Sequence, residues 1–252
     1  MRIAIALACI CTFASSPSAM VGGAPPANED AAGAVVMLTG SHGTFCSGVA
    51  LTRDLVLTAA HCVLPGAGYK LIEFDAARQP VLKDLAAIAR HPDFDVNAVL
   101  CHRVTADVAL LKLAAPLKLS PAPLARDSGS VAPGDRFVVA GYGVAVRGDG
   151  KTGGTLRAAT LIATGQPGTL QIRLADPATK GERAGLGACT GDSGAPVYRP
   201  VGGALAVIGV VSWSTGPALG DGCGGLTGVT PLVRYRAWMA EQATKLGSPL
   251  PP

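Results

Sequence analysis

The chain has 252 residues and a formal net charge of +4, and 49% of its residues are apolar whereas only 15% are charged. This balance excludes an intrinsically disordered chain, which would be polar and rich in charge. Glycine and proline contribute 33 and 19 residues without a three-residue period, which excludes collagen and favours many short elements joined by turns. Only 4% of the residues are aromatic and no run of five basic residues occurs, so the features of a nucleic-acid-binding surface are absent.

Residues 1–19 have the layout of a secretory signal peptide. A positive charge at Arg2 precedes a short apolar run, and small residues follow it up to Ala19. The alternative is a buried N-terminal strand or helix. The run is shorter than the roughly 20 apolar residues that cross a membrane, and no later stretch is longer, so we expect no membrane span. A signal peptide predicts a secreted protein, extracellular or periplasmic, in a compartment where disulfides persist.

The cysteine count is odd, because the chain has seven cysteines. Loss of residues 1–19 would remove Cys9 and Cys11 and leave five. At least one of those five must therefore lack a partner within the chain.

The mature chain reads as a series of short strands between turns. Apolar, β-branched runs predict strands at 34–39, 48–52, 55–58, 108–113, 136–140, 156–163, 170–174 and 206–212. No helical pattern separates them, which indicates an all-β sandwich or barrel. The proline-rich stretch 116–133 has turn character and predicts a connector between two halves of the chain.

The C-terminal region has a different pattern. Residues 231–245 place four apolar side chains on one face at helical spacing: Leu232, Tyr235, Trp238 and Met239. Pro231 suits a first helical turn and Gly247 is placed to end the helix. We expect a C-terminal helix followed by a loose tail over 247–252.

Three local motifs carry residues suited to acyl transfer. A strand end leads into His61, an acid at Asp107 opens an apolar strand, and glycines flank Ser193 in the run 191–196. Each motif alone also fits a core histidine, a turn acid or an ordinary loop. Together they supply a nucleophile at Ser193, a base at His61 and an acceptor at Asp107 that holds the imidazole.

The glycine before the serine motif has a further use. Gly191 permits a close backbone approach, so the N–H groups of Gly191 and Ser193 are placed to form an oxyanion hole. The order of the three residues along the chain is His, Asp, Ser. An α/β-hydrolase would have the order Ser, acid, His with a G-x-S-x-G motif, which Ala195 breaks.

These motifs, occurring together and in order, resemble those of the chymotrypsin (trypsin-like) family of secreted serine proteases. The resemblance includes Val21-Gly-Gly at the expected mature N-terminus and Val211-Ser-Trp at the substrate-binding strand. It implies two six-stranded antiparallel β-barrels with the active site in the cleft between them, plus a C-terminal α-helix. The implied division is 20–124 for the N-terminal barrel and 125–246 for the C-terminal barrel and helix.

The same resemblance implies two disulfides and one unpaired thiol. Cys46 is expected to pair with Cys62, and Cys189 with Cys223. Cys101 then has no partner, and it is either a buried free thiol or an intermolecular one. We expect it to be buried.

Activation in this family depends on an ion pair between a new N-terminal amine and the acid before the serine. Here the matching residues are Met20 and Asp192. Ala19 precedes Met20, so signal cleavage itself is expected to create the activating terminus, without a separate propeptide.

The specificity pocket is placed by alignment on the serine motif. The resemblance assigns six residues to it: Gly187, Ala188, Ser212, Trp213, Ser214 and Gly224. No acid lies at the base, Gly187, so cleavage after Arg or Lys is not expected. An uncharged pocket favours small, medium or aromatic apolar side chains before the scissile bond.

We therefore expect a serine endopeptidase that acts on proteins or peptides as a monomer, with a protein inhibitor as a further partner and with no cofactor. His42, His91 and His102 have no spacing typical of a metal site, and the acids near Glu73 are too few for a calcium site, so no metal is expected. The alternatives are a catalytically silent binding protein on the same scaffold, and an esterase that uses the same triad.

Overall fold

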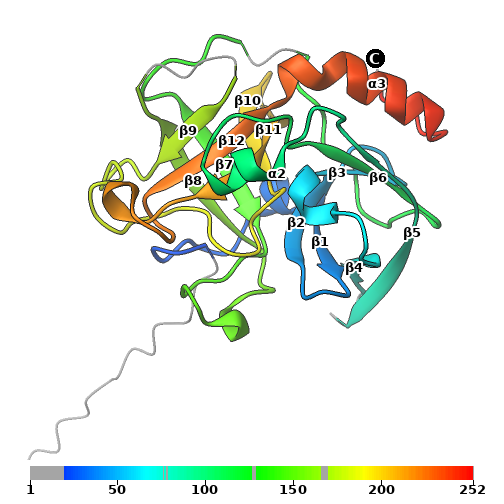
Figure 1. Ribbon diagram of the computed structural model, residues 1–252, viewed down its shortest axis with the longest axis horizontal. Coiled ribbons are helices and arrows are strands. Elements are labelled where there is room, and N and C mark those ends of the chain that lie inside the picture. The colour runs from blue at the N-terminus through cyan, green and yellow to red at the C-terminus, as the bar shows by residue number, and fades with distance from the viewer. Residues whose placement is uncertain (1–19, 76, 78, 127–128, 166–169, 252) are drawn as a thin grey trace, which may run out of the picture.

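Two closed six-stranded barrels lie side by side (Figure 1). The computed structural model describes residues 20–75, 77, 79–126, 129–165 and 170–251, so the expected signal peptide lies outside the described residues. Every strand pair within the barrels is antiparallel. The expected two-barrel, all-β fold is confirmed.

The first barrel closes in the order β1-β2-β3-β6-β5-β4. Its strands are β1 (Val35–Gly40), β2 (Phe45–Ala50), β3 (Leu55–Thr58), β4 (Tyr69–Phe74), β5 (Pro80–Arg90) and β6 (Ala109–Leu113). All four residues of β3 are buried, which fits its unbroken apolar sequence. The barrel therefore places the end of β3 and the start of β6 next to each other, because Thr58 pairs with Ala109.

The second barrel closes in the order β10-β11-β12-β9-β8-β7. Its strands are β7 (Arg136–Gly141), β8 (Arg157–Ala163), β9 (Ile172–Ala175), β10 (Pro196–Val201), β11 (Ala204–Ser214) and β12 (Leu226–Pro231). A short helix, α1 (Glu29–Ala32), precedes the first strand. Other short helical segments join strands in both halves: η1 (Ala60–Val63), α2 (Val96–Leu100), η2 (Gly150–Thr152) and η3 (Pro217–Leu219).

The C-terminal helix packs on the barrel that lies farther from it in sequence. A single 3-10 turn, η4 (Leu232–Tyr235), precedes α3 (Arg236–Lys245), so the α-helix begins five residues after Pro231. Met239 and Ala243 are fully buried in the same apolar cluster as β3 and β6. Figure 1 shows α3 extending over the side of the first barrel. The helix thereby connects the two halves.

Two expectations about single segments were wrong. Cys101, at the end of α2, is exposed rather than buried. The tail is not loose at its start, because Ser248 is buried and its hydroxyl contacts Asp54 and Lys112. Helix α3 ends where Gly247 adopts a left-handed φ of 71°, and that turn directs Ser248 back onto the first barrel.

No helix within the described residues is long and apolar enough to cross a membrane.

Candidate active site

The three predicted triad residues come from three loops at barrel ends. His61 lies in η1, directly after β3, and Asp107 precedes β6 by two residues. Because β3 and β6 pair, these two loops start at the same edge of the first barrel. Ser193 lies before β10 in the second barrel, and its carbonyl accepts a hydrogen bond of 2.8 Å from the N–H of Ser47 on β2.

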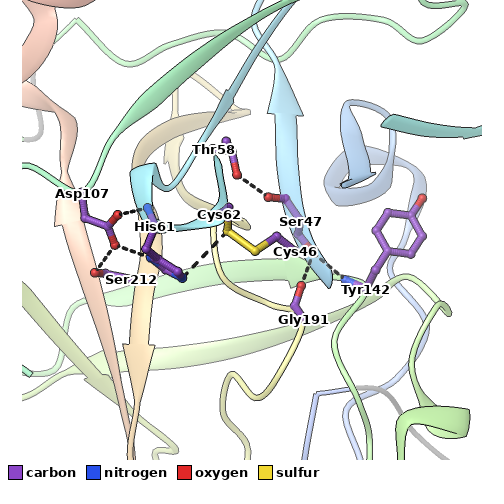
Figure 2. Close-up of a disulfide and its surroundings, with 9 residues drawn as sticks. All are labelled: Cys46, Ser47, Thr58, His61, Cys62, Asp107, Tyr142, Gly191 and Ser212. Atoms are coloured by element: carbon purple, nitrogen blue, oxygen red, sulfur yellow. Dashed lines mark hydrogen bonds and ion pairs between the residues drawn. A yellow bond between two sulfur atoms is a disulfide. The ribbon is translucent and has the colours of Figure 1, made fainter. Parts of the chain in front are cut away.

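Asp107 holds the histidine at two points (Figure 2). Its carboxylate, fully buried, accepts from the backbone N–H of His61 at 3.0 Å and contacts the ring Nδ1 at 2.8 Å. The Ser212 hydroxyl donates to the same carboxylate at 2.5 Å. Since an ionised carboxylate only accepts, Nδ1 carries the hydrogen and Nε2 is left with a lone pair. The histidine is thus oriented as a proton acceptor.

Ser193 and His61 share one cavity of about 350 Å³. Among the described residues, no hydrogen bond joins the Ser193 hydroxyl to the ring; Nε2 instead lies 3.8 Å from Cys62 Sγ. The structure therefore brings Ser193 and His61 to the same cavity, without a hydrogen bond between the serine hydroxyl and the histidine ring. Catalytic hydrogen bonds are often long in the free enzyme and shorten when substrate binds.

The loop before Ser193 has the backbone shape that an oxyanion hole requires. The Thr190 carbonyl accepts from the Val144 N–H at 2.8 Å. In a trans peptide the C=O and N–H point in opposite directions, so the Gly191 N–H points away from Val144. Gly191 has a φ of +96°, and a side chain there would strike the Phe45 ring. Only glycine fits this position.

Asp192 is fully buried. Its carboxylate accepts from the N–H groups of Gly143 and Cys189, each at 2.9 Å. Burial raises the pKa of Asp192 to about 7, although these two hydrogen bonds lower it. Met20 is fully buried in the core of the second barrel, and Val21 forms a β-bridge with Gly187. Val21 also packs in one apolar cluster with Cys189, whose N–H binds the Asp192 carboxylate.

The backbones of Gly187 and Gly224 pack closely at the predicted base of the specificity pocket. A side chain at Gly187 would lie 3.3 Å from the Gly224 Cα, and the Ala188 N–H donates to the Thr227 hydroxyl at 3.0 Å. The Ser214 hydroxyl donates to the Gly222 carbonyl at 3.2 Å. Of the six predicted pocket residues, Ala188, Trp213 and Ser214 line the cavity, whereas Gly187, Ser212 and Gly224 do not.

Both disulfides join segments that border the cavity. Cys46 is bonded to Cys62, next to His61, and Cys189 is bonded to Cys223. Within the part of the chain that the structure describes, the one cluster with metal-ligand spacing is Cys46, His61 and Cys62. Its two sulfurs are bonded to each other, so they are not thiolates and do not offer a zinc-type site.

Sequence reasoning missed several residues around the site. Ser47 contacts the nucleophile loop through hydrogen bonds and accepts another from the Tyr142 N–H, and Phe45 and Thr190 line the cavity. Ser47 follows Cys46 and precedes a predicted strand, and its neighbours in the sequence carry no sign of a contact 144 residues away.

Comparison with known proteins agrees with this geometry. The family model described as "Trypsin" matches residues 20–239. The chain is 29% identical over 227 residues to the vitellin-degrading protease of Bombyx mori. The alignment covers 84% of this chain and 80% of that protein. A solved structure described as "atomic resolution structure of HBP" aligns with a TM-score of 0.69 and 21% identity, covering 92% of this chain and 100% of the other.

The family model covers most of the chain, and the structural match supports the two-barrel fold. The histidine, aspartate and serine motifs lie inside the matched range. The chain belongs to the trypsin family of serine proteases.

Proposed function

We propose that this protein is a secreted serine endopeptidase in which His61, Asp107 and Ser193 form the catalytic triad. The observation that carries the proposal is the 2.8 Å contact between His61 Nδ1 and a fully buried Asp107, at the edge of a cavity that also contains Ser193. The named activity of the Bombyx mori relative, a protease, supports it. The two disulfides support an oxidising compartment.

In the proposed reaction, the Ser193 Oγ attacks the peptide carbonyl carbon while its proton passes to His61 Nε2. The carbonyl oxygen becomes an oxyanion, and the N–H groups of Gly191 and Ser193 stabilise it. His61 then gives the proton to the leaving amine, which departs and leaves an acyl-enzyme. A water molecule repeats the sequence and releases the acid, with Asp107 stabilising the imidazolium each time.

The preferred residue before the scissile bond is a small apolar one. A Cβ at Gly187 would lie 3.3 Å from the Gly224 Cα, and neither glycine lines the cavity. We take this close packing at the predicted base to favour a short side chain over a long or aromatic one. Ala188 contributes a methyl group, and the Ser214 hydroxyl is already bonded to Gly222. Among the described residues that line the cavity there is no Asp, Glu, Lys or Arg, so none of them compensates a buried charge of a substrate Arg, Lys, Asp or Glu.

Activation follows from cleavage after Ala19. No ion pair within the described residues involves the buried Asp192 carboxylate. The α-amine of Met20 would then supply a cation to it, and the ion pair would fix the nucleophile loop. Met20 is already buried in the second barrel, which supports this placement. We further propose that the mature protein acts as a monomer on protein or peptide substrates and accepts a protein inhibitor in the same cleft.

The test uses secreted protein that starts at Met20, together with Ser193→Ala. We expect a serine-directed phosphonate to label Ser193 and a peptide library to be cut after Ala or Val far more than after Arg, Lys or Phe. Absence of an adduct in folded protein would favour a binding protein on this scaffold. Turnover of esters without turnover of peptides would favour an esterase.

A further inference from the structure

The side chain of Ser47 lies between the first barrel and the loop that carries Ser193. Ser47 belongs to β2 and is fully buried. Its hydroxyl donates to the Gly191 carbonyl at 2.8 Å (Figure 2). Its backbone N–H donates to the Ser193 carbonyl at 2.8 Å. One residue of the first barrel thus holds the carbonyls of both residues whose N–H groups are proposed to bind the oxyanion.

The same hydroxyl accepts a hydrogen bond from a third segment. The Tyr142 N–H donates to Ser47 Oγ at 3.0 Å. The next two N–H groups, those of Gly143 and Val144, donate to the Asp192 carboxylate and to the Thr190 carbonyl. Three successive backbone groups therefore hold the nucleophile loop, two of them directly and one through Ser47.

The hydroxyl suits this position because it donates and accepts at once. A serine hydroxyl offers one hydrogen, which goes to Gly191, and lone pairs, one of which takes the Tyr142 N–H. Without it, two buried backbone groups would lose their partner, at a cost of about 1–3 kcal/mol each. The unpaired Gly191 carbonyl can reduce that cost by rotating towards another partner. Such a rotation is easiest at Gly191, because a glycine backbone has the greatest conformational freedom.

We propose that Ser47 is a positioning residue that fixes the oxyanion-binding loop from the opposite barrel. The inference rests on the proposed function, because an oxyanion hole matters only if Ser193 acylates. Ser47 touches no reacting atom. It acts through Gly191, whose N–H must stay aimed at the developing charge, and a displacement of about 1 Å there is enough to cost up to roughly 100-fold in rate.

The experiment compares Ser47→Ala with the parent protein on one peptide substrate. We expect kcat to fall by about 10-fold to 100-fold. This loss does not exceed that caused by removing a direct oxyanion donor, which lowers kcat by roughly 100-fold to 1000-fold. KM should change by less than about twofold. The affinity of a peptide aldehyde, which forms a tetrahedral adduct with Ser193, should fall by the same factor as kcat/KM, whereas the affinity of the cleaved product peptide should not change.

Ser248→Ala is the matched control for stability. The Ser248 hydroxyl is also buried and also has two partners, Asp54 and Lys112, but it lies in the C-terminal tail. This variant should lose stability and keep kcat. If Ser47→Ala does not accumulate as folded protein, Ser47→Gly, which also lacks the hydroxyl, takes its place with the same expected loss.

The outcomes separate the two proposals. A parent protein that turns over no peptide, like Ser193→Ala, overturns the proposed function and this inference with it. An active parent whose folded Ser47→Ala or Ser47→Gly variant keeps kcat and aldehyde affinity within about twofold overturns the role of Ser47 alone. An equal loss of kcat in Ser248→Ala would also overturn it, because the effect would then be one of stability.

Discussion

The orientation of the His61 ring depends on the carboxylate of Asp107. It accepts hydrogen bonds from the His61 backbone, the His61 ring and the Ser212 hydroxyl. In Asp107→Asn the amide would hold the ring in the other tautomer, with the hydrogen on Nε2, so that His61 no longer accepts the serine proton. We expect kcat to fall by about 10⁴-fold with little change in KM.

Steady-state kinetics at neutral pH check this expectation, with Asp93→Asn as the control, because that side chain is exposed on the same loop. If kcat of Asp107→Asn decreases by less than about tenfold, Asp107 does not orient the base.

The thiol of Cys101 gives a second prediction at this scale. Cys101 is exposed and free, and the other four cysteines outside residues 1–19 are in disulfides. An exposed thiol reacts without unfolding, so an aromatic disulfide reagent should titrate one thiol per chain in the native mature protein. The denatured protein should give the same count, and Cys101→Ser should give none. A thiol that appears only after denaturation would contradict the exposed position.

Single residues differ in how far the sequence predicts them. His61, Asp107 and Ser193 stand in motifs whose chemistry is readable locally. Ser47 does not, because its function in the site depends on two contacts to residues about a hundred or more positions away. Whether Cys101 is buried also depends on packing around α2, which the residues flanking it do not encode.

At the level of elements, the C-terminal tail is fixed by a small polar cluster. Ser248 donates to Asp54, and the Lys112 ammonium contacts both side chains. Burial alone would raise the pKa of Asp54, but the hydrogen bonds from Lys112, Ser248 and Thr52 lower it to about 2. The tail is thereby tied to β6 and to the loop before β3.

Removal of the Ser248 hydroxyl should therefore destabilise the protein in a pH-dependent way. The pKa of Asp54 is lower in the folded state than its ordinary value of 3.8, so the cluster stabilises fully above about pH 4 and loses its effect as the pH falls towards 2. We expect Ser248→Ala to lose about 1–2 kcal/mol at pH 7, after allowance for solvent screening, and less at pH 2.5.

Denaturant unfolding at the two pH values measures the difference, with the exposed Ser120→Ala as control. An equal deficit for Ser248→Ala at both pH values would show that Asp54 is not part of the contribution.

The sequence pattern predicted those strands that have one or both faces apolar. The predicted runs at 55–58 and 108–113 coincide closely with β3 and β6, both buried in the first core. Strand β5 was not predicted, because it is exposed or half-buried along its whole length and its sequence has no clear alternation. Strand β12 was missed because glycine and threonine dominate it, and its burial comes from pairing between β9 and β11.

At the scale of the whole molecule, function depends on how the two barrels are joined. The proposed triad takes two residues from the first barrel and one from the second, and α3 spans from the second barrel to the core of the first. The order of motifs indicated this division, but the close approach of Gly187 and Gly224 arises only when the loops after β9 and β11 fold together. Which residues line the pocket was therefore beyond local sequence reasoning, since Gly187 and Gly224 are not among them.

The buried Asp192 carboxylate, the proposed partner of the Met20 amine, gives a prediction at the scale of the whole fold. With residues before Met20 still attached, burial raises the pKa of Asp192 to about 7 from an ordinary value of 3.8. Between about pH 4 and pH 7 the folded chain then holds a proton that the unfolded chain has released. Stability of this extended form must fall as the pH rises through that window.

A free α-amine at Met20 should abolish this loss, because the paired carboxylate ionises without penalty. We expect a form that starts at Met20 to be more stable than one that retains Ser18 and Ala19, by little at pH 4 and by at most about 4 kcal/mol near pH 7. Unfolding curves of both forms across pH 4–7.5 measure this, and activity should rise in parallel. In the extended form, Asp192→Asn should flatten the profile because the titrating group is gone. Identical pH profiles for the two termini would show that the Met20 amine does not reach Asp192, and activation would need another route.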